Sequence, residues 1–115
     1  MRIGGCYDKT GKPIRMLAWA KLFEDKNYKT IKQTTLPNKK WVSTVWLGLD
    51  HSFEESKKPL IFETMVFKRK LTGNFKKNRK LAYDLDSQRY STLKEAIEGH
   101  DKMCKKWGKK KWIKN

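Results

Sequence analysis

Long apolar runs, cysteines and acidic residues are all scarce in this 115-residue chain. No apolar stretch approaches the roughly 20 residues that a membrane-spanning helix requires, and the N-terminal residues lack the apolar segment of a secretory signal. Cys6 and Cys104 are far apart and form no CxxC pair, so the sequence predicts two free thiols rather than a disulfide or a structural zinc site. We therefore expect a cytoplasmic protein without a cofactor.

The length of the chain suits one domain and is too short for two independent cores. Hydrophobic residues make up 37% of the chain, and they include five tryptophans, five phenylalanines and four tyrosines. This apolar surface is enough to offset the conformational entropy that is lost on folding. We expect a single domain at residues 1–107 and a basic C-terminal tail at residues 108–115.

The 12 acidic residues are outnumbered by 28 basic ones, which gives a net charge of +16. Residues 68–80 contain seven basic residues and no acid, and residues 105–115 contain six and no acid. The other 15 basic residues stand against all 12 acids, so the excess charge lies mainly in these two segments. Cationic segments of this kind attract phosphates, because neutralising a phosphate releases its condensed counterions.

The opening residues predict a short extended piece, a turn at residues 8–11 and then a short N-terminal helix that begins at Pro13. One apolar stripe with helical spacing supports the helix: Met16, Trp19, Ala20 and Phe23. Residues 29–35 are polar and β-favouring, which indicates an edge strand, and Pro37 marks the turn that follows.

Residues 41–49 and 60–67 carry large side chains at both odd and even positions, as strands covered on both faces do. The connection between them is too short for a parallel crossover, so we expect them to be antiparallel neighbours. Residues 68–80 then form a basic connection with its tip at residues 72–74, and residues 81–90 predict another strand.

The last element is a helix, because Thr92 and Glu95 have the spacing of a capping box and Gly108 supplies a stop. Its apolar face is predicted to contain Leu93, Ala96, Ile97, His100, Met103, Cys104 and Trp107. The expected fold is α+β: an antiparallel sheet of about four strands, with this amphipathic helix packed on one face and a short helix at the N-terminus.

Three motifs resemble those of a family of small uncharacterised bacteriophage and prophage proteins. They are VSTVWLGLDHSF at residues 42–53, PLIFETMVF at residues 59–67, and RYST at residues 89–92 followed by Glu-Ala and Gly-His pairs. The resemblance spans residues 7–104 and implies a phage protein made in the bacterial cytoplasm, with no particular activity. The basic residues at 68–80 and in the tail depart from the family pattern.

The two basic segments predict a surface that binds a polyanion, although charge runs can also serve only as solvated faces. Aromatic rings lie among the cations and can stack on unpaired bases, so RNA or single-stranded DNA is the expected partner. Trp107 is either one of these rings or part of the core. The predicted contact residues are Lys68, Arg69, Lys70, Phe75, Lys76, Lys77, Arg79, Lys80, Lys105, Lys106, Lys109, Lys110, Lys111, Trp112 and Lys114.

A phage protein with such a surface fits a host-defence antagonist that binds a host nucleoprotein effector, such as an inhibitor of a CRISPR effector. A membrane surface is a weaker alternative, because the tail is short and carries no lipidation signal. The sequence indicates neither the target nor the oligomeric state.

The alternative hypothesis is an enzyme, because Asp50, His51, Glu63 and His100 are residue types that bind a divalent metal or transfer protons. Such a cluster would suit a small metal-dependent phosphodiesterase, or a protein that handles or sequesters a nucleotide. We favour instead a buried polar network in which His100 hydrogen-bonds to Glu63, because no HExxH, GxSxG or phosphate-loop motif is present. Asp50 then only caps a turn.

Overall fold

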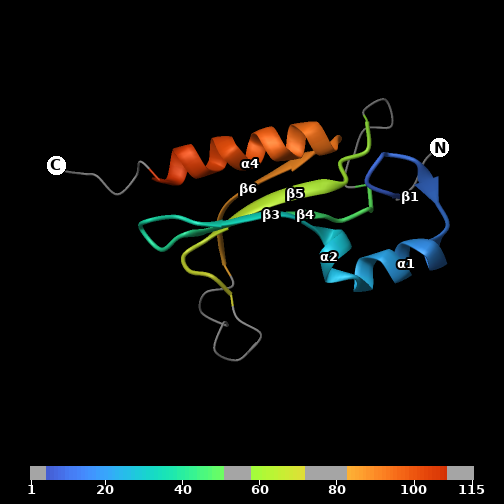
Figure 1. Cartoon of the computed structure of the whole chain (residues 1–115). Coiled ribbons are helices and arrows are strands. Elements are labelled where there is room, and N and C mark those ends of the chain that lie inside the picture. Colours follow the sequence, from blue (N-terminus) through green and yellow to red (C-terminus); the bar gives the residue numbers. More distant parts are fainter. Residues whose placement is uncertain (1–4, 51–57, 72–82, 109–115) are drawn as a thin grey trace.

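The computed structural model describes residues 5–50, 58–71 and 83–108, and its centre is a four-stranded antiparallel sheet (Figure 1). The strands follow one another in chain order: β3 (Thr30–Thr35), β4 (Trp41–Trp46), β5 (Phe62–Phe67) and β6 (Asp84–Tyr90). The two central strands, β4 and β5, are the ones whose sequences predicted cover on both faces. The expected edge position of β3 and the α+β class are confirmed.

Helix α4 (Leu93–Gly108) lies across one face of the sheet (Figure 1). The predicted capping box begins it, since the Glu95 N–H donates to Thr92 Oγ1 at 3.1 Å and the Thr92 N–H donates to Glu95 Oε1 at 3.2 Å. The buried face of α4 is narrower than predicted. It contains Ala96, Gly99, His100 and Met103, whereas Leu93 and Ile97 at its margin are 38% and 40% exposed.

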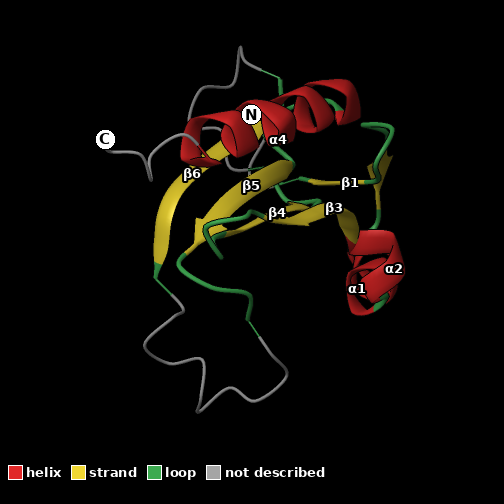
Figure 2. Cartoon of the chain, turned by 60° about the vertical axis from the view of Figure 1, so that its left-hand side comes forward, coloured by secondary structure: helices red, strands yellow, loops and turns green. Residues whose placement is uncertain are grey.

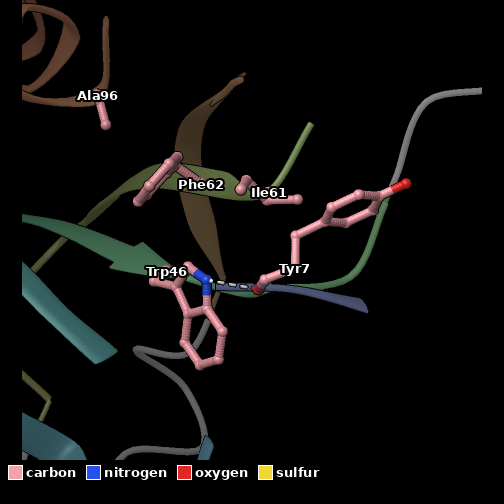
Figure 3. Close-up of a cluster of buried hydrophobic side chains, with 5 residues drawn as sticks. All are labelled: Tyr7, Trp46, Ile61, Phe62 and Ala96. Atoms are coloured by element: carbon pink, nitrogen blue, oxygen red, sulfur yellow. Dashed lines mark hydrogen bonds between the residues drawn. The ribbon is translucent and has the colours of Figure 1, made fainter. Parts of the chain in front are cut away.

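The core has two clusters between the sheet and its surrounding helices. One contains Leu36, Val42, Val66 and Met103, and it lies beneath the C-terminal half of α4. The other contains Tyr7, Trp46, Ile61, Phe62 and Ala96, which Figure 3 shows. In this second cluster Trp46 Nε1 donates a hydrogen bond to the Tyr7 carbonyl at 3.1 Å, so the buried indole N–H is satisfied.

The N-terminal residues form a hairpin of β1 (Cys6–Tyr7) and β2 (Pro13–Ile14), and helix α1 (Met16–Glu24) follows. The predicted start of this helix at Pro13 is therefore wrong. Asp8 holds the tight turn between the strands, because its Oδ1 accepts from the N–H groups of Thr10 and Lys12 at 2.9 and 3.0 Å. Proline fits β2 because the strand is short and lies at an edge.

Helix α1 packs against the core through Trp19, Leu22 and Phe23, and α2 (Lys26–Lys29) follows it directly. Met16, which was predicted on the buried stripe, is 67% exposed. Helix α2 was not predicted from the sequence. Its N-cap is Asp25, whose Oδ1 accepts from the N–H groups of Asn27 and Tyr28. Figure 2 shows α1 and α2 on the side of the sheet opposite α4.

Cys6 is buried and Cys104 is half-buried, and both are free thiols, as predicted. Within the described ranges, none of the helices has the length and apolar composition needed to cross a membrane.

Candidate functional site

His100 joins α4 to the sheet through threonine hydroxyls. Its ring is fully buried, with Nδ1 2.7 Å from Thr44 Oγ1 and Nε2 2.9 Å from Thr34 Oγ1. The Thr44 hydroxyl also hydrogen-bonds to the hydroxyl of Thr64. Burial, and to a smaller extent the charge of Lys32, lowers the pKa of His100 below its ordinary value. A neutral imidazole has one donor and one acceptor, and hydroxyls can satisfy both.

Glu63 lies on the opposite face of the sheet from His100. It follows Phe62 and precedes Thr64 in β5, and successive side chains of a strand point to opposite faces. Its Oε2 accepts instead from Nε of Arg89, its register partner in β6, at 3.2 Å. The predicted hydrogen bond between His100 and Glu63 is therefore wrong, because both ring nitrogens of His100 bond to threonines.

The other two members of the predicted cluster lie beyond the end of β4. Asp50 Oδ1 accepts from the Leu60 N–H at 3.3 Å, and His51 lies outside the described residues. In the part of the chain that the structure describes, no three His, Cys, Asp or Glu side chains lie close enough together to hold a metal. The fold thus places Asp50, Glu63 and His100 in three different surroundings.

The first residues of both cationic segments meet at one end of the sheet. Strand β5 ends at Phe67, which pairs with Trp41 directly after the β3–β4 turn. In that turn, Asn38 Nδ2 donates to the Trp107 carbonyl at 2.9 Å and so joins the turn to the C-terminal end of α4. Figure 1 shows the β3–β4 turn and this end of α4 at the same end of the sheet. We call this region the basic end and define it by six cations: Lys39, Lys40, Lys68, Arg69, Lys70 and Lys105.

These six side chains are available to a ligand. Lys40 is half-buried and the other five residues are exposed, and none has a carboxylate within ion-pair distance among the described residues. The predicted contact residue Lys106 differs from them, because its Nζ lies 2.7 Å from Asp86 Oδ2. Hydrogen bonds from Lys106, and next from the Trp107 indole, lower the pKa of Asp86. Asp86 therefore neutralises Lys106, whereas the six other cations have no ion-pair partner among the residues that the structure describes.

Three further residues lie at this end that the sequence did not predict as contact residues: Lys39, Lys40 and Tyr83. Tyr83 is 78% exposed and directly precedes β6, whose first residue pairs with Phe67, so it lies beside the start of the basic connection. Trp107, in contrast, packs against the core and donates Nε1 to Asp86 Oδ2 at 2.9 Å. The sequence signal that could have placed Lys39 and Lys40 here is their position after Pro37, in the turn of a hairpin whose second strand pairs with β5.

The remaining predicted contact residues lie outside the described residues: Phe75, Lys76, Lys77, Arg79, Lys80, Lys109, Lys110, Lys111, Trp112 and Lys114. The predicted tip at residues 72–74 also lies outside them. The described chain stops at Leu71 and at Gly108, and it resumes at Tyr83.

No family model matches the chain, and no curated protein or solved structure is significantly similar to it. The resemblance to small phage and prophage proteins therefore stays a prediction.

Replacing Lys39 by glycine is expected to stabilise the fold and weaken polyanion binding at the same time. Lys39 has a φ of 76°, in the left-handed region that costs a side-chain-bearing residue about 1 kcal/mol relative to glycine. Urea denaturation should show a gain of about this size, while Lys40→Gly, which lies just before β4 and has no positive φ, should destabilise. Loss of stability in Lys39→Gly would contradict the interpretation of this turn.

Proposed function

We propose that the protein binds a nucleic acid through its basic end, either free or within a host nucleoprotein complex. The observation that carries this proposal is the convergence, at one end of the sheet, of six cations from three separate chain segments, none of them ion-paired to another described residue. A surface of one sign of charge raises the local concentration of a polyanion and speeds its association. Asp86 is engaged in structural contacts with Lys106 and Trp107, and the exposed Asp84 at the start of β6 is a single carboxylate beside six cations.

A single strand, of RNA or DNA, is the nucleic acid that this surface fits best. The exposed ring of Tyr83 lies beside the cations, and stacking of a base on an aromatic side chain contributes roughly 1–3 kcal/mol when the base is unpaired. Cations then hold the backbone while the ring holds a base. In a bacterium, such a protein would act as an antagonist of a host-defence nucleoprotein, a CRISPR effector for example, by occupying its nucleic-acid channel.

Reversing four charges at the basic end is expected to weaken the binding of a single-stranded oligonucleotide by roughly 100-fold at low salt. The variant carries glutamate at Lys39, Lys68, Arg69 and Lys70. Log affinity falls with log salt, and each phosphate contact on a single strand contributes about 0.7 to the steepness of that fall. Loss of four contacts should therefore make the dependence shallower by about 3. Fluorescence anisotropy across a salt series measures both quantities, with an oligonucleotide longer than the roughly 4–16 nucleotides that one small domain covers.

A variant with the same change in charge at the other end of the molecule is the control. It carries glutamate at Lys12, Arg15, Lys21 and Lys26, four exposed positions around α1 and α2. This control should keep the salt dependence of the unmodified protein, because the four residues that it replaces make no phosphate contact under the proposal. Equal loss in both variants would show that binding is not localised, and no binding by the unmodified protein would remove the proposal.

A further inference from the structure

The two edges of the sheet are joined to α4 in different ways. At the β3 edge, Lys32 Nζ lies 2.8 Å from Asp101 Oδ1, and the Thr34–His100 hydrogen bond lies beside this ion pair. At the β6 edge the side-chain hydrogen bonds to α4 that join described residues are confined to Asp86. A groove of about 680 Å³ lies along the rest of β6, between this strand and α4.

The groove has an apolar floor and a polar rim. Tyr90 and Met103 form the floor, and the ring of Tyr90 approaches α4 so closely at Gly99 that a Cβ there would lie 2.2 Å from it. Gln88 on the strand, with Glu98 and Lys102 on the helix, form an exposed rim. Close packing of Tyr90 against a glycine therefore holds the strand and helix at the spacing that leaves the groove open.

The outer edge of β6 presents backbone groups to this groove. The Ile61 N–H donates to the Tyr90 carbonyl at 3.0 Å, so the backbone of Tyr90 faces β5. Because these directions alternate along an antiparallel strand, Ser87 and Arg89 direct their backbone groups outward. Asp86 Oδ1 accepts the Ser87 N–H at 2.9 Å, which leaves the N–H and C=O of Arg89 for a further strand.

The helix side of the rim carries both signs of charge, with Glu98 and Lys102 exposed one turn apart on α4. Glu98 is exposed on the helix rim, and no cation lies within ion-pair distance of it among the described residues. Its neighbour Glu95 is engaged in the capping box. Glu98 is thus an acidic group available to a ligand on a chain whose net charge is +16.

We propose that this groove binds an extended segment of a partner protein, which adds to β6 as a fifth strand and places a lysine or arginine side chain against Glu98. Main-chain hydrogen bonds to Arg89 hold the segment, and Tyr90 and Met103 receive one of its apolar side chains. A second copy of this strongly basic chain is disfavoured as the occupant because the two copies repel each other. The proposal does not depend on nucleic-acid binding at the basic end.

The test uses a displayed library of random linear peptides, selected against the full-length protein. A recovered peptide is then synthesised and its affinity measured for Arg89→Pro and Arg89→Ala. Both variants lose the ion pair with Glu63, but only proline removes the outward N–H. We expect Arg89→Pro to weaken binding at least about tenfold and Arg89→Ala to leave it nearly unchanged. The Arg89 amide should also exchange more slowly with solvent when the peptide is bound.

Glu98→Lys keeps the test decisive if Arg89→Pro does not fold. It should weaken binding of a peptide that contains lysine or arginine by about tenfold, whereas Glu24→Lys, the same change on the distant helix α1, should not. Failure to recover any peptide, or equal affinity for Glu98→Lys and Glu24→Lys, would overturn the proposal. So would a dimer of the unmodified protein that Arg89→Pro dissociates, because a second copy would then occupy the edge.

Discussion

Replacing His100 by leucine is expected to lower the free energy of unfolding by about 3 kcal/mol. Leucine is also large and apolar, but it cannot hydrogen-bond to the hydroxyls of Thr34 and Thr44, which the helix covers. Thr44 keeps its bond to Thr64, but each hydroxyl loses its bond to the ring, and a buried polar group that loses its partner costs about 1–3 kcal/mol. Urea denaturation at neutral pH measures the effect, and a loss below about 1 kcal/mol would contradict the role of His100 in joining α4 to the sheet.

Removal of the partner hydroxyl provides the control for this experiment. Thr44→Val should cost less in the His100→Leu background than in the unmodified protein, because the bond to His100 is already absent there and only the bond to Thr64 is lost. Thr44→Val alone should destabilise. Strict additivity of the two substitutions would contradict the hydrogen bond between these side chains.

His100 also predicts a loss of stability in mild acid. Its pKa is lowered in the folded protein, chiefly by burial, so the unfolded chain binds the proton more tightly. The stability that depends on the neutral ring is present above pH 6.5, the ordinary His pKa, and is lost as the pH falls from there toward the folded pKa. The charge of Lys32 acts in the same direction, and that of Asp101 opposes it. The loss of stability below pH 6.5 that His100 causes should be absent from His100→Leu and should remain in His51→Gln.

Replacing Gly48 by alanine is expected to destabilise the protein by about 4 kcal/mol. Gly48 has a φ of 74°, which costs an alanine about 1–2 kcal/mol. A Cβ at this position would also lie 2.4 Å from Trp46 Cζ2 and 2.6 Å from Trp19 Nε1. Neither ring can move without loss, because Trp46 bonds to the Tyr7 carbonyl and Trp19 Nε1 donates to the Leu47 carbonyl at 2.9 Å.

Gly11→Ala separates the backbone cost from the steric cost. Gly11 has a φ of 88°, and a Cβ there would have no neighbour within 4 Å. Its substitution should therefore cost only about 1–2 kcal/mol. Thermal or urea denaturation of both variants gives the difference, which reports the packing of the two tryptophans. Equal losses would show that the rings can shift to accept the extra carbon.

Local signals predicted most of the regular structure. The capping box at Thr92 and Glu95 depends on residues three positions apart, and both predicted hydrogen bonds are present. The antiparallel pairing of β4 with β5 was predicted from the short connection between the expected strands 41–49 and 60–67, and it is confirmed, although the connection in the structure runs from residue 47 to residue 61. The errors fell where a competing local structure was equally compatible with the residues, as at Pro13, which suits either a first helical turn or a short edge strand.

The candidate site was predicted only in part. The cationic residues Lys68 and Lys105 were expected in contact with a ligand, and the structure leaves both exposed and unpaired within its described ranges. Lys39 and Tyr83 join them only because one end of the sheet collects the β3–β4 turn, the end of β5 and the end of α4. Contacts of this kind join residues far apart in the chain, and no local pattern records them.

The sequence by itself determined the strong positive charge, the helix and strand periods, and thereby the α+β class of the fold. These properties depend on composition and on neighbours within a few positions along the chain. The tertiary structure alone decided that His100 bonds to threonines, that Glu63 lies on the opposite face of the sheet, and that the six cations of the basic end lie together at one end of the sheet. A shift of one residue in strand register exchanges the two faces of a sheet, so such outcomes depend on how every element packs together.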